Sequence, residues 1–280
     1  MNTTKVKNSL PVMLAPKTAR TDRFSLKPWH GLALATICIL SSVTAYAAAD
    51  PARASVFEVL LRWVPLLLKG FVFNVVISVF AMAFGTIVGA ALGLGQISLS
   101  GWVRKTAWFV TQFFRNSPWL VLLFFAMFLL PFEIQIGSLV IPLPDWFKAI
   151  LGLSLPVMAN VSEIVRGAIS SLPSGQWEAA ESLAFSRNQV LWRIILPQCV
   201  KRMLPPWMNL YSILTMATVL ASIVGVSEVM TLTGQALAAE GGRSDLLIPF
   251  YSFVLFIFFI YCYPIARWTV YLEKKFAVKT

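Results

Sequence analysis

Polar side chains inside apolar stretches are the residues of this sequence that could best do chemistry. Asn74 and Ser78 lie one helical turn apart in one such stretch, and Asn160 and Glu163 lie near the end of another. Amide, hydroxyl and carboxylate groups can hold a polar solute by hydrogen bonds and charge. Burying these groups in an apolar environment costs free energy, so polar residues at such positions are candidates for a functional role.

A longer polar series falls in a third apolar stretch. Its members recur every three or four residues, which would place them on one helix face, and they are Asn209, Ser212, Thr215, Thr218 and Ser222. Two interpretations stay open: the face lines a polar passage, or it only forms hydrogen bonds between helices. Our candidate pathway residues are Asn74, Asn160, Glu163, Arg166, Asn209, Ser212 and Thr215. For Glu163 and Arg166, an i,i+3 ion pair is the favoured interpretation over direct contact with a solute.

The sequence offers no constellation for catalysis or metal binding. His30 is the one histidine, and Cys38, Cys199 and Cys262 lie far apart without a CxxC motif, which argues against metal sites, His-dependent triads and a disulfide framework. No GxxxxGK[ST] nucleotide-binding loop occurs either. We therefore expect no catalytic residue, no metal and no cofactor in this chain. If ATP drives the protein, another chain binds it.

The composition determines what kind of protein must position these residues. Of 280 residues, 58% are hydrophobic and 12% are charged, whereas soluble domains have roughly 45–50% and about 25%. The chain is therefore expected to be an all-α integral membrane protein with lipid around it, since no alternating segments typical of a β-barrel occur. The net charge of +11 is better explained by basic ends of membrane helices than by nucleic-acid binding.

Six uncharged or nearly uncharged stretches are long enough to be transmembrane helices. They cover residues 29–49, 70–97, 116–132, 146–165, 203–227 and 246–266. Residues 1–28 form a basic tail, residues 50–69 have the pattern of an amphipathic helix at the membrane surface, and residues 271–280 form a second tail. Most of the 23 Lys and Arg residues lie on one side if both termini are cytoplasmic, which favours that orientation.

Two features of the spans add detail. Residues 29–49 end in Ala45-Tyr46-Ala47, which is also typical of a signal-peptidase site; we favour a retained extra span over a cleaved signal. In the next span, small residues recur every fourth position and predict a face against which another helix packs closely. These residues are Ala81, Gly85, Gly89 and Gly93.

The loop between the fourth and fifth stretches, residues 166–202, is the most informative segment. Ser174 and Gly175 can begin a helix, and a second helix over about 187–196 is expected to stop at Pro197. Two short helices with small apolar residues on a basic loop indicate a docking element for a partner. Its candidate contact residues are Gly175, Gln176, Glu178, Ala179, Ala180, Leu183 and Ala184.

This loop resembles the EAA loop of the permease subunits of ABC importers, in the polar-amino-acid branch. The resemblance rests on GQWEAAESLAFSRNQVLWRIILPQ, on residues 114–120 (FRNSPWL), on the E-x-x-R-G pattern of 163–167, and on Gly70 to Asn74. It extends over about residues 65–270. Two departures stand out: Ala184 replaces the family glycine, so its turn is either helical or strained, and residues 216–220 lack the charged pair of K-D-T-S-L. The second departure allows a modified amino acid or an opine-like solute.

The resemblance implies a five-span importer core over 70–270, preceded by the extra span at 29–49. It implies uptake of a polar amino acid or related small solute through an inner-membrane subunit. The expected partners are ABC ATPase subunits docked on the EAA loops, a second identical or homologous permease subunit, and a periplasmic solute-binding protein. A secondary transporter and a non-transporting membrane scaffold are the alternatives: the first would show a repeated half or a chain of Asp and Glu through the spans, and the second would not need polar faces in several spans.

Overall fold

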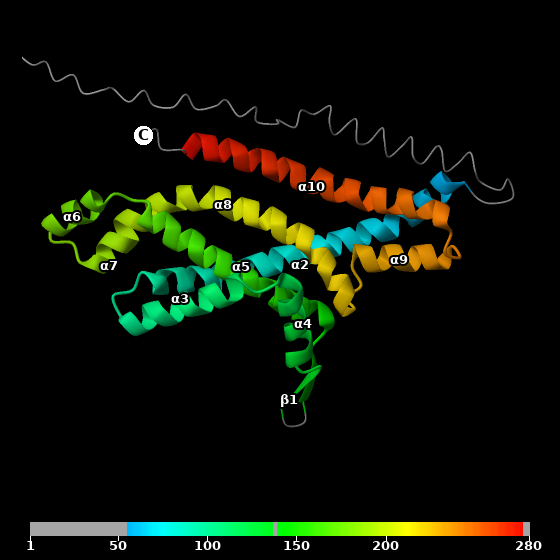
Figure 1. Ribbon diagram of the computed structural model, residues 1–280, viewed down its shortest axis with the longest axis horizontal. Coiled ribbons are helices and arrows are strands. Elements are labelled where there is room, and N and C mark those ends of the chain that lie inside the picture. The colour runs from blue at the N-terminus through cyan, green and yellow to red at the C-terminus, as the bar shows by residue number, and fades with distance from the viewer. Residues whose placement is uncertain (1–54, 137–138, 277–280) are drawn as a thin grey trace, which may run out of the picture.

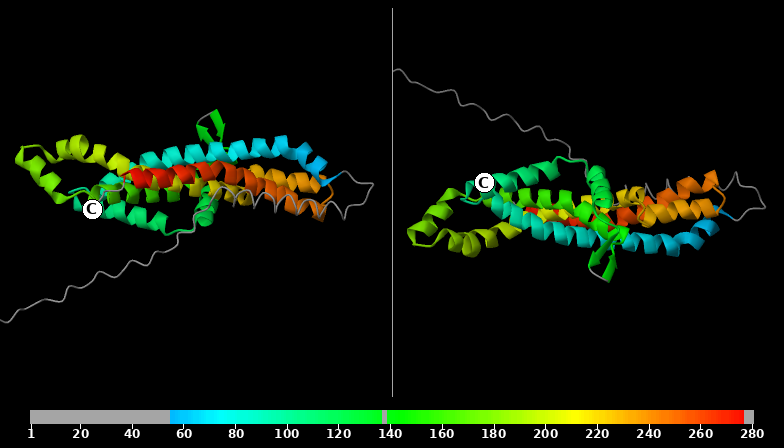
Figure 2. Two further views of the ribbon diagram at one scale, coloured as in Figure 1. Left: turned by 90° about the horizontal axis from the view of Figure 1, so that it is seen from above. Right: turned by 90° about the horizontal axis from the view of Figure 1, so that it is seen from below.

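The computed structural model describes residues 55–136 and 139–276. The basic tail 1–28, the predicted extra span 29–49 and the end of the second tail lie outside the described residues. Four helices, α2, α5, α8 and α10, run alongside one another and form an elongated bundle (Figures 1 and 2). Helices α6 and α7 lie at one end of this bundle, and α9 lies at the other.

Helix α2 (Val56–Gln96) is a single helix of 41 residues, which starts at a capping box formed by Ser55 and Glu58. At about 1.5 Å per residue it is about 60 Å long, twice the thickness of a hydrocarbon core. The expectation of a separate amphipathic surface helix over 50–69 is therefore wrong. The apolar face of that part, with Val59 and Leu67, is buried under α9 and α10 in a second hydrophobic cluster and not against lipid headgroups.

Only part of the third predicted stretch, 116–132, is helical. Helix α3 (Gly101–Arg115) and helix α4 (Trp119–Leu129) meet at an angle of 104°. Pro118 precedes α4 and disfavours the α conformation for Ser117, so α4, the helix within 116–132, is 11 residues long and does not continue α3 in a straight line. An antiparallel hairpin follows, β1 (Glu133–Ile136) and β2 (Leu139–Pro142), in which Ile134 pairs with Ile141. The sequence analysis did not predict these strands.

Helix α5 (Asp145–Ser170) coincides closely with the fourth predicted span and is the most buried of the long helices. Its packing against α2 uses the predicted small-residue face. A Cβ at Gly85 would lie 2.5 Å from Val157 Cγ1, and one at Gly89 would lie 2.5 Å from the Met158 carbonyl oxygen. The two backbones therefore approach as closely as glycine allows, as expected for this motif.

The EAA loop leads directly into the fifth span. Helix α6 (Ser174–Ser182) begins where predicted, and α7 (Arg187–Gln189) continues through a π-helical turn, η1 (Val190–Ile195), into α8 (Leu196–Ala217). The predicted stop at Pro197 is wrong. Proline lacks a donor and its ring clashes with the carbonyl four residues earlier, and the wider π turn just before Pro197 lets the helix continue.

The last elements return to the opposite end of the bundle. A 3-10 segment η2 (Thr218–Val224) ends at Gly225, whose φ of 90° reverses the chain. Helix α9 (Val229–Ala239), the short η3 (Ser244–Leu246) and α10 (Leu247–Phe276) follow. Within the described ranges the structure has four helices long and apolar enough to cross a membrane, or five if the bent α3–α4 pair counts as one.

Candidate functional site

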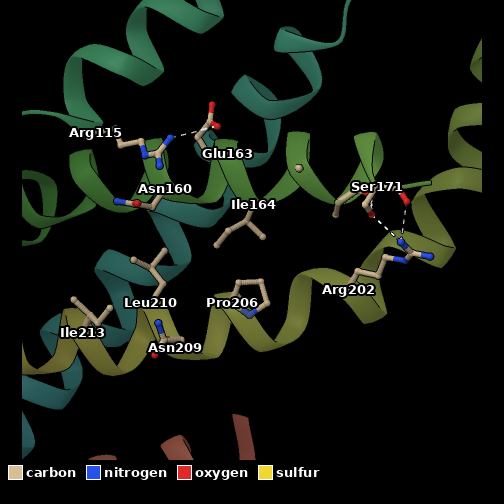
Figure 3. Close-up of a pocket in the computed structure, with 12 residues that line it drawn as sticks. Arg115, Asn160, Glu163, Ile164, Ser171, Arg202, Pro206, Asn209, Leu210 and Ile213 are labelled. Carbon is tan, nitrogen blue, oxygen red and sulfur yellow. Dashed lines mark hydrogen bonds and ion pairs between the residues drawn. The ribbon is translucent and has the colours of Figure 1, made fainter. Parts of the chain in front are cut away.

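A polar groove lies between α5 and α8 toward the end that carries the EAA loop (Figure 3). Its volume is about 570 Å³. Arg115 from α3, Asn160 and Glu163 from α5, and Asn209 and Arg202 from α8 supply its polar lining. Aliphatic and proline side chains, among them Ile164, Pro206, Leu210 and Ile213, complete the wall.

Glu163 is the most extensively bonded residue of the groove. Arg166 Nη2 lies 2.7 Å from its Oε2, and Arg115 Nη1 lies 3.4 Å from the same oxygen. Gln96 Nε2 donates to Glu163 Oε1 at 3.2 Å. The predicted i,i+3 ion pair is confirmed, and because protein donors occupy both carboxylate oxygens, Glu163 ties α2, α3 and α5 together at one wall of the groove.

Arg202 closes the groove at the end nearest the EAA loop. Its Nη1 donates to the Ser171 carbonyl oxygen at 3.0 Å and to Ser171 Oγ at 2.9 Å, as Figure 3 shows. The sequence analysis did not single out Arg202, Arg115 or Ser171 as site residues. The available signal was weak, because basic residues beside a predicted cytoplasmic loop are expected on any membrane protein.

Two of the predicted pathway residues, Asn160 and Asn209, face this groove from opposite helices. Asn160 Nδ2 donates to the Pro156 carbonyl oxygen at 2.8 Å, which leaves its Oδ1 as an acceptor. Asn209 is exposed to the groove. The pair can therefore offer both donors and acceptors to a polar solute.

Asn74 belongs to a different cluster, between α2 and the η2–α9 turn. It is fully buried, and its Nδ2 donates to Thr218 Oγ1 and to Glu228 Oε2, each at 2.9 Å. Its Oδ1 accepts from Val229 N at 3.0 Å. Burial raises the pKa of the Glu228 carboxyl, and hydrogen bonds from Asn74 and Thr231 oppose that rise. Asn74 and Glu228 thus secure the turn before α9.

Ser212 and Thr215 lie inside the helix packing, away from the groove lining. Thr215 Oγ1 donates to the Tyr211 carbonyl oxygen at 2.9 Å, and Ser212 Oγ donates to the Met208 carbonyl oxygen at 3.4 Å. Both side chains are buried. Their hydroxyls are therefore satisfied within α8 itself, and the structure does not bring them together with Asn160 and Asn209.

The predicted contact residues of the EAA loop divide into two groups. Ala180 is 4% exposed and packs in the main hydrophobic core of this chain, and its contact with a partner stays a prediction. Gly175, Glu178 and Ala179 are exposed, and Leu183 is 73% exposed. Gln176 is half-buried, and its Oε1 has no hydrogen-bond partner in the described part of the chain.

Ala184 forms the turn between α6 and α7 with a φ of 60°. The two alternatives of the sequence analysis are therefore decided: the turn is left-handed, and the strain is tolerated. Among the described residues it is the one non-glycine residue with a positive φ. Such a conformation costs an L-residue about 1–2 kcal/mol.

Replacement of Ala184 by glycine is expected to stabilise the protein by about 1 kcal/mol, because glycine adopts this conformation without strain. Thermal unfolding of the purified protein in detergent measures the change. Ala179→Gly, inside α6, is the matched control and is expected to destabilise by about 1 kcal/mol. A loss of stability in Ala184→Gly would contradict the strain argument.

Comparison with known proteins places these features in context. A family described as binding-protein-dependent transport system inner membrane components matches residues 81–278. The probable amino-acid ABC transporter permease protein YckA of Bacillus subtilis (strain 168) is 35% identical over 214 residues, which are 76% of this chain and 90% of that protein. The inner membrane amino-acid ABC transporter permease protein YhdY of Escherichia coli (strain K12) is 32% identical over 188 residues. These residues are 67% of this chain and 50% of YhdY.

The fold also has a counterpart among solved structures. The crystal structure of an amino acid ABC transporter with histidines contains a chain that superimposes with a TM-score of 0.67. The match covers 77% of this chain and 96% of that chain, at 22% sequence identity. At this identity the likeness concerns the overall fold alone.

Proposed function

The chain belongs to the family of binding-protein-dependent transport system inner membrane components, and from this premise we propose that its polar groove is part of the path of a polar amino acid or related small solute. The protein is a multi-pass inner-membrane permease subunit of an ABC importer and not an enzyme. The observation that supports the path most directly is the pair Asn160 and Asn209, which face one cavity from α5 and α8.

The chemistry of the groove suits a zwitterionic solute. Arg115 and Arg202 provide positive charge, Glu163 provides a negative charge that Arg115 and Arg166 partly neutralise, and Asn160 and Asn209 provide neutral donors and acceptors. Ile164 and Leu210 supply an apolar wall for the solute's side chain. A volume of about 570 Å³ falls in the range of sites for small ligands. The curated relatives named as amino-acid permeases support this solute class, and a modified or opine-like amino acid stays within it.

The proposal also includes the partner proteins of this chain. ATP binds to separate ATPase subunits and no cofactor binds to this chain; the ATPases dock on the EAA loop. A second permease subunit, identical or homologous, completes the pathway, and a periplasmic solute-binding protein delivers the solute. Both termini lie in the cytoplasm, which the distribution of Lys and Arg supports.

Replacement of Asn209 by leucine is expected to reduce solute uptake about tenfold, because the groove loses hydrogen bonds to the solute that are worth about 1–1.5 kcal/mol. Uptake of labelled amino acids by the reconstituted complex measures it. Asn209→Ser keeps a donor and an acceptor and serves as the matched control. Equal uptake by Asn209→Leu and the control, with equal amounts of assembled complex, would contradict a role of Asn209 in the pathway.

A further inference from the structure

Another cavity, with two basic residues in its lining, lies between α8 and α10, at the same end of the bundle as the EAA loop. Its volume is about 370 Å³, and its lining consists of Pro197, Gln198, Lys201, Arg202 and Phe276. Helices α8 and α10 run side by side over this region (Figure 1). The cavity is separate from the groove between α5 and α8, although Arg202 stands at the edge of both.

The positive charge around this cavity is not neutralised within the described residues. Lys201 is exposed and forms no ion pair in that part of the chain. Lys274 and Lys275 occupy the last turn of α10, where Glu273 is the neighbouring acid and forms no ion pair among the described residues. Arg202 is held by Ser171. The cavity therefore has several free N–H donors and a net positive field.

Along α10, away from the cavity, one helix face carries exposed aromatic side chains. Trp268, Tyr271 and Lys275 follow an i, i+3, i+7 spacing along α10 and so share one face; Trp268 and Tyr271 are exposed. Lys275 Nζ lies 5.9 Å from the centroids of both the Tyr271 and the Phe276 rings. On α8, Val200 is exposed as well. Basic residues next to exposed aromatic side chains at a helix end are typical of the headgroup level of a membrane.

We propose that this cavity binds the headgroup of an anionic phospholipid, with the phosphate near Lys201 and Lys275 and an acyl chain along Tyr271 and Trp268. Basic pockets between membrane helices on the cytoplasmic side are suited to such headgroups. The chain's own N-terminal tail is a poor occupant, because residues 1–28 carry six Lys and Arg residues against Asp22. The cytoplasmic leaflet follows from the proposed docking of an ATPase on the EAA loop, on which this inference rests.

Two of the residues that line the cavity lie in the first turn of α8, where the EAA loop leads into that helix. Pro197 and Gln198 directly follow the π-helical turn, and Gln198 Nε2 donates to the Ile194 carbonyl oxygen at 3.0 Å. Arg202 links the cavity through Ser171 to the end of α5. A bound headgroup would thus brace the stem of the EAA loop against α10, at the point where α8 enters the membrane.

Retention of lipid by the purified full-length chain tests the proposal. The protein in neutral detergent is titrated with dioleoylphosphatidylglycerol or dioleoylphosphatidylcholine, and bound lipid is counted by native mass spectrometry. Phosphatidylglycerol is expected to bind at one tight site and phosphatidylcholine is not. Lys201→Gln combined with Lys275→Gln is expected to weaken the tight site roughly 25-fold, at about fivefold for each basic residue near the headgroup.

Arg104→Gln combined with Lys105→Gln is the matched control, because it removes the same charge from exposed positions of α3 and should leave the tight site intact. Equal loss in both double variants would overturn the proposal, as would equal retention of phosphatidylcholine. Displacement of phosphatidylglycerol by millimolar inorganic phosphate would also overturn it, since the site would then recognise a free anion. The readout does not depend on uptake, so a failure of the proposed transport function is seen separately in the Asn209 experiment.

Discussion

Replacement of Gly89 by alanine is expected to destabilise the protein by about 3 kcal/mol, because the added methyl group has no space between α2 and α5. Its Cβ would lie 2.5 Å from the Met158 carbonyl oxygen and 2.8 Å from Val161 Cβ. A backbone carbonyl within a packed helix cannot rotate away as a side chain can. The two helices would have to separate along their most extensive contact, and thermal unfolding of the purified protein in detergent measures the loss.

Gly234→Ala is the matched control, since Gly234 lies inside α9 and a Cβ there meets no atom within 4 Å. It is expected to be neutral or to stabilise by up to about 1 kcal/mol through helix propensity. Equal unfolding temperatures for Gly89→Ala and the unchanged protein would show that the close approach of α2 and α5 is not what holds the bundle together.

The features that the sequence predicted correctly depend on local spacing. The four-residue repeat of Gly85, Gly89 and Gly93 indicated a close helix contact, and that contact is α2 against α5. The i,i+3 spacing of Glu163 and Arg166 indicated an ion pair, which is present. Apolar length located α5 within a few residues. Each of these inferences needs only helix geometry, which the residues themselves determine.

The errors arose where tertiary packing or backbone adjustment decides the outcome. The amphipathic pattern of 50–69 was interpreted as membrane surface, whereas Val59 and Leu67 pack against other parts of the protein. The stop expected at Pro197 ignored that a π turn can accommodate a proline. The burial of Ala180 could not be predicted, because alanine is equally suited to a core and to a close contact with a partner.

The predictions for the polar residues of α8 were also partly right and partly wrong. Spacing placed Asn209, Ser212 and Thr215 on one helix face, but a helix surface curves away from a groove within a few residues. Asn209 therefore lines the cavity, while Ser212 and Thr215 are buried and bond to their own helix. In the two polar clusters, Glu228 accepts a hydrogen bond from Asn74 and Arg202 donates one to Ser171. Each bond joins residues far apart in the sequence, so it depends on which helices pack next to each other.

Replacement of Ala179 by arginine is expected to abolish the association of the ATPase, and transport with it, while the chain still folds and inserts. Ala179 is exposed on α6, next to the exposed Glu178 and near Leu183, which is 73% exposed. Ala179 and Leu183 offer apolar contacts beside the acidic Glu178 at α6, which lies at one end of the molecule (Figure 1), and the proposed partner there is an ATPase. Ala180 cannot serve for this test, because it is buried and arginine there would disrupt the loop itself.

The expected loss has a physical basis that the control can isolate. Overpacking of a closely fitted contact costs about 1–3 kcal/mol, and an unpaired charge buried in it costs more, so copurification of the ATPase should fall at least tenfold. Ala179→Ser adds little volume and no charge and should preserve both association and uptake. If Ala179→Arg copurifies with its ATPase at normal stoichiometry, the exposed face of α6 is not the docking surface. The contact would then lie elsewhere on the chain, because Ala180 on the other face of α6 is buried in this chain's own core.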